Sequence, residues 1–446
     1  ATPPAGGGTA YEGVNKLTAK KSQQFSSNGT ATLYQLAETG IVSVDNVTVG
    51  GVETTAYTAN LTTGAVTFTT APTTGINDVQ IWWTGSANDR AKINAMKFAE
   101  QYNGTTDNRV FLYGDGTNET IYSGIDSLGI PTAEYFPDLN VAAIGDSNTP
   151  ITGMCRQFSR LIVFKSASTF SIAYSAITLA DGSVTAGFYV TPVNRNIGND
   201  AMGQIRLVTN YPYSLHGGGV YLWKNGSYGL TSDERQAKRI SQRVESTLAG
   251  FTLSECVTFE NEYKQDYYIV DGDSAVIYNY TTDAWFIYTE FPAAAFVMVG
   301  NEMYIGTDGG NFCHVSRNYK SDDGAAIDCY WRSGSIDFQR EWQRKFSTTI
   351  WVSIKPEDNA RVTVTAQSDR KSGYAETVVA SSLATFTAAN FAHWSFATNR
   401  RAQVIRVRLK VKKFALYQLI FQDASNDATC TILSTDFRVA YTGNVK

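Results

Sequence analysis

Short apolar runs separated by turn-forming residues constrain the fold of this chain more than any other feature. Between residues 108 and 319, one apolar run after another leads into a Gly, Asp, Asn or Ser turn and then into a second apolar run. The leading runs lie at residues 109–113, 160–164, 219–223, 267–270 and 302–305. The clearest unit places residues 275–280 directly after a turn at 271–274. Such strand–turn–strand units predict the blades of a β-propeller, in which small sheets are arranged radially.

The composition agrees with a chain built mainly of strands. Of the 446 residues, 43% are hydrophobic, 13% are aromatic and 17% are charged. This charged share is below the usual value of roughly 25%, and the abundant Thr, Tyr and Val favour strands over helices. The length exceeds that of one ordinary hydrophobic core, which indicates roughly two to four domains.

We therefore predict an all-β fold with a small N-terminal β-sandwich module, a central β-propeller, a C-terminal jelly-roll-like β-sandwich and few short helices. The sandwich module is indicated by short Val, Thr, Tyr and Phe alternations with turn signals at Gly50 and Gly64. The predicted parts are a flexible, Pro/Gly-rich N-terminal arm at 1–24, the sandwich module at 25–87, the β-propeller at 88–325 and the C-terminal sandwich at 326–446.

Two segments have helical spacing instead of strand spacing. Residues 88–102 predict a short helix at a domain boundary, with Asn88 as its cap. Residues 231–249 predict a helical insertion in the propeller, because residues 231–234 have the form of a capping box. The apolar stripe of this second helix consists of Ala237, Ile240, Val244 and Leu248.

The C-terminal part carries longer alternating strands. Residues 348–354 and 361–366 are predicted to pair around a turn at 356–359, and residues 403–413 predict one strand with an apolar face and a basic face. The basic row, our candidate interface or DNA-facing site, consists of Arg406, Arg408, Lys410 and Lys412. Cations about 6.6 Å apart can meet phosphates or an acidic partner surface. The alternative is an exposed edge strand that charge protects against unwanted pairing.

No motif for catalysis, metal binding or cofactor binding occurs in the sequence. The three histidines, His216, His314 and His393, lie far apart, and there is no HExxH string. The five cysteines are widely spaced without a CxxC pair, which predicts reduced, buried thiols. A nucleophile elbow and a phosphate-binding loop are also lacking. We predict a protein that is not an enzyme, has no catalytic residues and uses no metal or cofactor, although a site assembled from distant residues would leave no local motif.

Charge and hydropathy restrict the partners of the chain. The formal net charge of −4 gives no global attraction for nucleic acid or for an anionic membrane. No apolar run reaches the length that crosses a bilayer. Contact with DNA is therefore expected to be local or loose, and no membrane partner is expected.

Several strings in this order resemble one protein family. They are NRVFLY at 108–113, EYFPD at 134–138, IGD at 144–146, ITG at 151–153 and RLIVF at 160–164. Residues 57–68 are similar to a small β-module of phage tail proteins, and the ending from residue 417 onward resembles a terminal sandwich. Together these passages resemble the β-propeller tail proteins of tailed bacteriophages, the tail nozzle, tail-tubular or head-to-tail connector stabilisation proteins.

The resemblance implies a structural virion protein of the phage tail, assembled in the host cytoplasm. Such a protein forms a homo-oligomeric ring, often of six subunits, that gates and conducts DNA during ejection. Its implied partners are the neighbouring adaptor or portal-side proteins, the distal spike or fibre proteins and, transiently, the DNA in the channel. The alternative is a glycan-binding or depolymerising phage tail protein at the host surface, which predicts a groove lined by aromatic rings and carboxylates.

Overall fold

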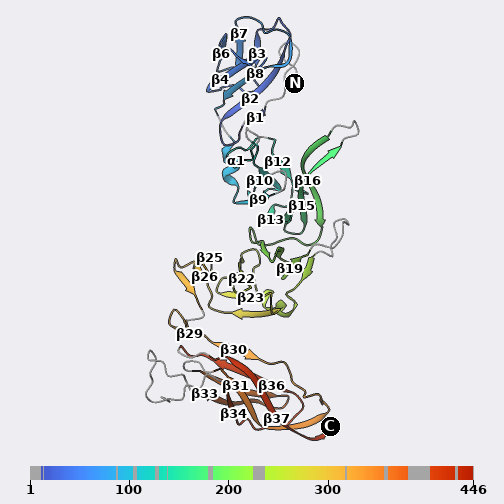
Figure 1. Cartoon of the computed structure of the whole chain (residues 1–446), viewed down its shortest axis with the longest axis vertical. Helices are drawn as coiled ribbons and strands as arrows, with labels where there is room; N and C mark the ends of the chain where they lie inside the picture. The colour runs from blue at the N-terminus through green and yellow to red at the C-terminus, as the bar shows by residue number, and fades with distance from the viewer. Residues whose placement is uncertain are drawn as a thin grey trace. The chain divides into compact units, whose positions relative to one another are not determined.

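The computed structural model confirms the all-β fold class, with 56% of the chain in strands and 4% in helices. The chain forms two compact units, Ala1–His314 and Val315–Lys446, coloured blue to gold and orange to red in Figure 1. The structure describes residues 12–13, 15–86, 89–103, 108–125, 130–137, 139–178, 184–224, 237–316, 319–355, 360–379, 402–426 and 430–444. The second unit thus begins at Val315, earlier than the boundary at residue 326 that the sequence predicts.

Two small sheets packed face to face form the N-terminal module. The first contains, in spatial order, β1 (Glu12–Gly13), β2 (Lys20–Ser27), β8 (Gly75–Thr84), β4 (Ser43–Val49) and β5 (Val52–Glu53). The second contains β3 (Leu33–Gln35), β7 (Ala65–Phe68) and β6 (Tyr57–Asn60). Phe25, Tyr34, Val66, Ile81 and Trp83 belong to the core between them. A flexible arm reaching residue 24 is wrong for the described part of that segment, because β2 already pairs with β8 from Lys20 onward.

Five small antiparallel sheets follow one another along the chain. The first four each have four strands and the fifth has three. The first sheet contains β9 (Phe98–Asn103), β10 (Asn108–Tyr113), β11 (Glu119–Tyr122) and β12 (Val141–Ala143), and the second contains β13 (Ile151–Gln157), β14 (Arg160–Lys165), β15 (Thr169–Thr178) and β16 (Val184–Asn194). The third sheet contains β17 (Arg206–Val208), β18 (Tyr211–His216), β19 (Gly219–Trp223) and β20 (Ala237–Arg239), and the fourth contains β21 (Val257–Asn261), β22 (Asp266–Asp271), β23 (Ser274–Asn279) and β24 (Ala284–Tyr288). The fifth sheet contains β25 (Ala295–Val299), β26 (Glu302–Gly306) and β27 (Phe312–Val315).

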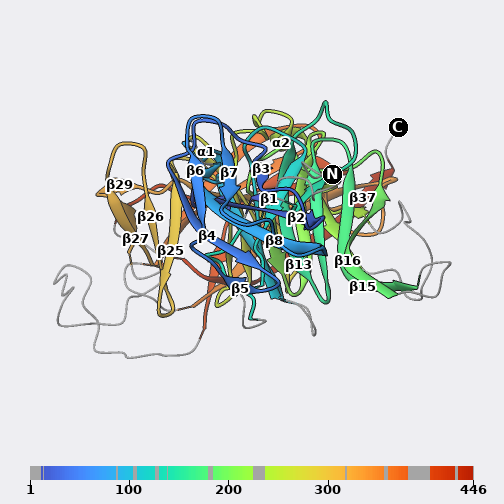
Figure 2. The same ribbon diagram turned by 90° about the horizontal axis from the view of Figure 1, so that it is seen from above.

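These five sheets pack one after another in chain order. The first strand of each sheet lies at an edge of that sheet, and β9 packs beside β13, β13 beside β17, β17 beside β21 and β21 beside β25. Figure 2 shows the strands of the last sheet standing side by side. The first strands of the five sheets thus contact one another in order from β9 to β25. Three of these strands, β13, β17 and β21, carry residues of the candidate site.

Apolar side chains fill the space between successive sheets. Ile144, Met154 and Leu161 belong to a core shared by the first and second sheets, whereas Phe164 and Trp223 pack edge to face with centroids 5.3 Å apart between the second and third. The fourth and fifth sheets meet through stacked rings of Phe259 and Phe296, whose centroids are 4.8 Å apart. Each sheet therefore buries one face against the next.

The structure corrects both helix predictions. Helix α1 spans only Arg90–Ala95, and Phe98–Asn103 is strand β9, in which Tyr102 is buried against β10. The insertion is not a helix over its described part, because Ala237–Arg239 is β20 and pairs with β19. Only a 3-10 turn at Gln242–Val244 and the single turn α2 (Glu245–Leu248) are helical.

The helix predictions fail for an identifiable reason. β9 pairs with β10 and β20 pairs with β19, which satisfies backbone groups at the edges of these strands. Helical spacing in the sequence does not reveal such pairing, so tertiary contacts outweigh the local pattern. Val244 and Leu248 are nevertheless buried in the core of the third and fourth sheets, as their stripe predicts. Asn88 and residues 231–236 lie outside the described residues.

The second unit is a β-sandwich. One sheet contains β30 (Cys329–Arg332), β36 (Tyr417–Asp423), β32 (Arg361–Ser368) and β33 (Ser372–Val379). In the other, β31 (Gln343–Ile354) pairs with β34 (Gln403–Val407) and β35 (Val411–Phe414) along one edge and with β37 (Ile432–Asn444) along the opposite edge. A short hairpin of β28 (Ser321–Asp322) and β29 (Ala325–Ala326) precedes them.

The expected pairing of residues 348–354 with 361–366 is wrong. Those residues lie in β31 and β32, which belong to different sheets and contribute to one core through Val352 and Val364. The predicted turn at 356–359 lies outside the described residues. The prediction of buried cysteines also fails at Cys329, which is exposed, whereas Cys155 and Cys256 are buried.

A buried lysine ties the first sheet to the second. Lys165 ends β14 with no exposed surface, and its Nζ donates to the carbonyl oxygens of Ile144 at 2.8 Å and Asp146 at 2.5 Å. The Asp146 carboxylate lies 3.6 Å from the same nitrogen. Burial lowers the pKa of Lys165, and the charge of Asp146 opposes this shift.

We expect Lys165→Met to lower the free energy of unfolding by about 3 kcal/mol, because the buried carbonyl oxygen of Ile144 and the part-buried one of Asp146 lose their donor. Urea denaturation of the full chain measures this change. Lys238→Met, at an exposed lysine of β20, is the matched control and should change stability by less than about 0.5 kcal/mol. Equal stability of the two variants would contradict a structural role for the buried ammonium.

Candidate functional site

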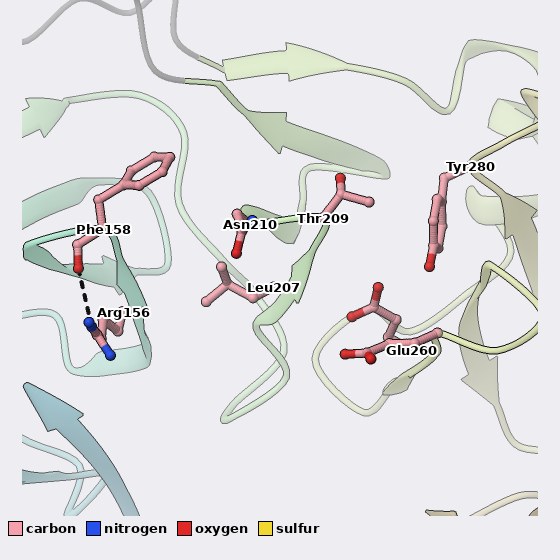
Figure 3. Close-up of a pocket in the computed structure, with 8 residues that line it drawn as sticks. Arg156, Phe158, Leu207, Thr209, Asn210, Glu260 and Tyr280 are labelled. Atoms are coloured by element: carbon pink, nitrogen blue, oxygen red, sulfur yellow. Dashed lines mark hydrogen bonds between the residues drawn. The ribbon is translucent and has the colours of Figure 1, made fainter. Parts of the chain in front are cut away.

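A cleft of about 730 Å³ lies where the second, third and fourth sheets of the first unit meet. The first strands of these sheets contribute Arg156 from β13, Leu207 from β17 and Glu260 from β21. The full lining is Arg156, Phe158, Leu207, Thr209, Asn210, Glu260, Glu262 and Tyr280. In Figure 3, Arg156 and Phe158 lie on one side, Glu260 and Tyr280 on the other, and Leu207, Thr209 and Asn210 between them.

Tight turns position two parts of this lining. Thr209 and Asn210 form the two-residue connection between β17 and β18, with φ of 50° and 66°. Positive φ at both positions is the geometry of a type I′ hairpin turn, which matches the twist of the flanking strands. This conformation is unusual for a β-branched residue such as Thr209. Phe158, in the turn between β13 and β14, also has a positive φ, of 54°.

Glu260 is the most perturbed carboxyl group of the cleft. Burial raises its pKa to about 7, and the negative charge of Glu262 adds to the increase. Hydrogen bonds from the Tyr280 hydroxyl and the Thr209 N–H act in the opposite direction. Burial and the charge of Glu260 raise the pKa of Tyr280 to about 12, so the tyrosine remains protonated. Near neutral pH, Glu260 therefore exists in both protonation states.

Arg156 supplies the positive charge of the cleft. Its Nε donates to the carbonyl oxygen of Phe158 at 3.1 Å, which holds the guanidinium beside that turn. Burial raises the pKa of Glu100 in the neighbouring β9, and Arg156 opposes this shift through a backbone hydrogen bond and its charge. One carboxylate outside the cleft thus partly compensates the arginine.

Polar side chains also connect β17 with β21 behind the cleft. Arg206 Nε donates to the Thr258 carbonyl oxygen at 3.0 Å, and the Thr258 N–H donates to Gln204 Oε1 at 2.8 Å. These bonds satisfy backbone groups at the free edge of β21. They fix the spacing of the strands that carry Leu207 and Glu260.

The lining suits binding by hydrogen bonds better than metal or nucleophile chemistry. It contains two carboxyl groups, one guanidinium, one amide and two hydroxyls, but no histidine or cysteine. Among the described residues, no group of three His, Cys, Asp or Glu side chains could hold a metal ion. The described part of the chain also contains no helix that could cross a membrane.

None of the cleft residues was expected from the sequence. They come from positions 156 to 280 and meet only because three sheets pack side by side. The one local signal is the pair Glu260 and Glu262, which interrupts the apolar pattern at the end of β21. Charged residues at such a position otherwise indicate an ordinary solvent-exposed turn.

The structure places the predicted basic row on an edge of the second unit. Residues 403–413 are not one uniform strand, since β34 ends at Val407 and β35 begins at Val411, but their alternation is confirmed. Val407, Leu409 and Val411 are buried, whereas the four cations of the row are exposed: Arg406, Arg408, Lys410 and Lys412. They lie more than 120 positions after the last cleft residue and do not contribute to the cleft.

The edge next to this row is partly capped. The Arg408 N–H donates to Glu376 Oε2 at 2.5 Å, so a carboxylate of β33 occupies one backbone donor that another strand would need. Trp351 of β31 lies opposite Arg406 on one neighbouring strand, β34, and opposite Asp436 on the other, β37. Charged edges of this kind prevent pairing between molecules.

A second surface feature is the outward face of the fifth sheet. Val297 is 44% exposed, Val299 60% and Phe312 68%, although all three are apolar residues of strands. Tyr304 stacks between the rings of Phe312 and His314, with centroids 5.2 and 4.6 Å away. The opposite face of the same sheet packs on the fourth sheet through Phe296. One face of this sheet is therefore covered and the other is not.

We expect replacement of the four cations of the basic row by Gln to promote aggregation through β34, because the edge loses its charge. Static light scattering at increasing protein concentration measures this change. A variant that stays as soluble as the wild type but loses salt-dependent affinity for duplex DNA would instead identify the row as a phosphate-contacting surface.

The pKa of Glu260 predicts a pH-dependent stability. A carboxyl group whose pKa rises on folding, here from 4.5 to about 7, binds its proton more tightly in the folded chain, so its contribution to stability falls as pH rises through this range. Glu260→Gln removes the titratable carboxyl group and with it this loss of stability at higher pH. We expect its melting temperature to exceed that of the wild type by about 2–4 °C at pH 8 and to equal it at pH 4.

Glu53→Gln in β5 is the matched control for this measurement, since Glu53 is exposed and far from the cleft in sequence. Its effect on the melting temperature should be the same at both pH values. Glu262 and Tyr280 also face the Glu260 carboxyl, and both are unchanged in the comparison. A pH-independent difference for Glu260→Gln would contradict the burial of this charge.

Comparison with known proteins gives no family. No protein-family model and no curated protein matches the chain. Among solved structures, an exo-β-1,3-galactanase from Phanerochaete chrysosporium is 8% identical with a TM-score of 0.26, covering 75% of this chain and 93% of that one. The core factor of S. cerevisiae is 8% identical with a TM-score of 0.29, covering 74% of this chain and 57% of that one. These similarities are too low to carry an argument about function.

Proposed function

We propose that this chain is a structural subunit of the tail of a tailed bacteriophage, forming a ring-shaped nozzle or connector that gates and conducts DNA during ejection. The observation that carries the proposal is the uncovered apolar face of the fifth sheet, formed by Val297, Val299, Tyr304 and Phe312. Contiguous exposed apolar surface of this kind marks protein–protein contacts. The apolar face of the fifth sheet is therefore suited to assembly.

The kind of assembly, a ring in a phage tail, is proposed from the sequence resemblance. Of the strings that carry it, 108–113 is β10 of the first sheet and 160–164 belongs to β14 of the second, whereas residues 134–137 lie between β11 and β12 of the first sheet. In this proposal the chain forms a homo-oligomeric ring, for which six copies is the number common in the family it resembles. The ring stacks on adaptor or portal-side proteins and continues into distal spike or fibre proteins. The protein belongs to the virion and performs no catalysis.

A conduit for DNA also needs walls that do not hold the DNA. The net charge of −4 suits this task, because affinity for DNA grows with the number of phosphates that cations neutralise. Small sheets that pack on one another form stiff walls. These properties support the proposal.

We expect the wild-type protein at micromolar concentration to form rings, alone or with its neighbouring tail proteins, and the double variant Val297→Glu with Val299→Glu to remain monomeric. Charges on the uncovered face cannot be buried in an interface without a partner. Multi-angle light scattering gives the mass and negative-stain electron microscopy gives the shape.

The control for this experiment is Val52→Glu in β5, where the valine is 71% exposed on the N-terminal module. This variant should assemble like the wild type. Circular dichroism checks that all variants keep their strand content. A wild-type protein that stays monomeric even when mixed with the neighbouring tail proteins would overturn the proposal.

A further inference from the structure

We infer that the cleft between the second, third and fourth sheets is a binding site for a neutral saccharide. This inference goes beyond the proposed structural role, because a conduit wall needs no site for a small ligand. It starts from a volume of about 730 Å³, which lies within the range of ordinary small-molecule sites, about 300–1,000 Å³.

The polar groups of the cleft match the hydroxyls of a sugar. The carboxylate of Glu262 accepts hydrogen bonds, the guanidinium of Arg156 donates them, and the Asn210 amide does both. The Tyr280 hydroxyl donates its proton to Glu260 and can accept a hydrogen bond from the ligand. Each sugar hydroxyl can likewise donate and accept. A mixed set of this kind pairs fully with a polyhydroxylated ligand, whereas a ligand that only accepts would leave the carboxylates without partners.

The charges favour a neutral ligand over an ion. An anion would meet two carboxyl groups, Glu260 and Glu262, and the one guanidinium is already held by the Phe158 carbonyl oxygen and influenced by Glu100. A cation would meet Arg156. Because Glu260 titrates near pH 7, the cleft does not hold two full negative charges at neutral pH.

Aromatic rings on the two sides of the cleft provide apolar contact. Phe158 is 55% exposed on its turn, and Figure 3 shows its ring across the cleft from Tyr280. The C–H groups on the face of a sugar ring pack well on such aromatic surfaces, and the Tyr280 hydroxyl adds a polar contact at the ring edge. An isolated exposed Phe is common on protein surfaces, but here it borders a cavity lined by hydrogen-bonding groups.

The turns that carry these residues keep the cleft in place. Thr209 and Asn210 hold a type I′ geometry, and the Thr209 N–H donates to Glu260, so the turn and the acidic side chain fix each other. Gln157, next to Arg156, donates to the Asn210 carbonyl oxygen at 3.4 Å. A site fixed before binding loses less entropy when its ligand arrives.

The test uses the full-length wild-type protein on an array of neutral and acidic oligosaccharides, followed by calorimetry with the neutral glycan that binds best. We expect binding to a neutral glycan and a loss of affinity of about tenfold or more in Phe158→Ala and in Glu262→Gln. Trp342→Ala, which removes an aromatic side chain that is 64% exposed in the second unit, is the matched control and should bind like the wild type.

Three results would overturn the inference: no binding to any neutral glycan, binding to acidic glycans alone, or equal affinity of the wild type and both cleft variants. Light scattering of the same variants separates this inference from the proposed assembly. Phe158→Ala should form the same oligomer as the wild type, because Phe158 is not part of the uncovered face. Failure to bind glycans would therefore not contradict the assembly proposal, and a monomeric wild type would not contradict saccharide binding in the cleft.

Discussion

A β-sheet with an apolar face must bury that face, and the organisation of this chain follows from how each sheet does so. In the N-terminal module and in the second unit, two sheets cover each other, so each core is complete. In the region of the five small sheets, each sheet packs on the next, for example through Phe164 and Trp223 or through Phe259 and Phe296. In a linear series of this kind, the last sheet has no following sheet to cover its second face. The exposed valines of β25 lie on this last face, and the proposed assembly depends on them.

The strands themselves could be predicted from the sequence because the two-residue period and the turn residues are local signals. All five leading runs of the propeller region form strands, and 275–280 follows its turn as expected, in β23 up to Asn279. Pairing partners are less visible, because they depend on distant residues. Residues 348–354 and 361–366 look like a hairpin in the sequence, yet β31 pairs with β34, β35 and β37, and β32 pairs with β33 and β36. The sheet that a strand joins is decided by partners up to about one hundred residues away.

The helical segments and the cleft escaped prediction for the same physical reason. The stripe from Ala237 to Leu248 has helical spacing, but β19 needs a neighbouring strand, and Ala237–Arg239 provides it. Glu260 and Tyr280 look like ordinary surface residues until the packing of β17 against β21 places them beside Thr209 and Asn210. By contrast, the burial of Val407, Leu409 and Val411 depends only on alternation and was predicted.

Free strand edges explain why polar groups gather in the middle of the propeller region. The first strand of each sheet lies at an edge of that sheet, where groups outside the sheet can satisfy its backbone donors and acceptors. Arg206 and Gln204 do this for β21, and Gln157 does so for the turn after β17. Because these links use long polar side chains instead of apolar packing, they leave a polar space between the sheets. The cleft with Arg156 and Glu260 lies in that space, so the arrangement that stabilises the free edges also creates the conditions for binding a hydroxyl-rich ligand.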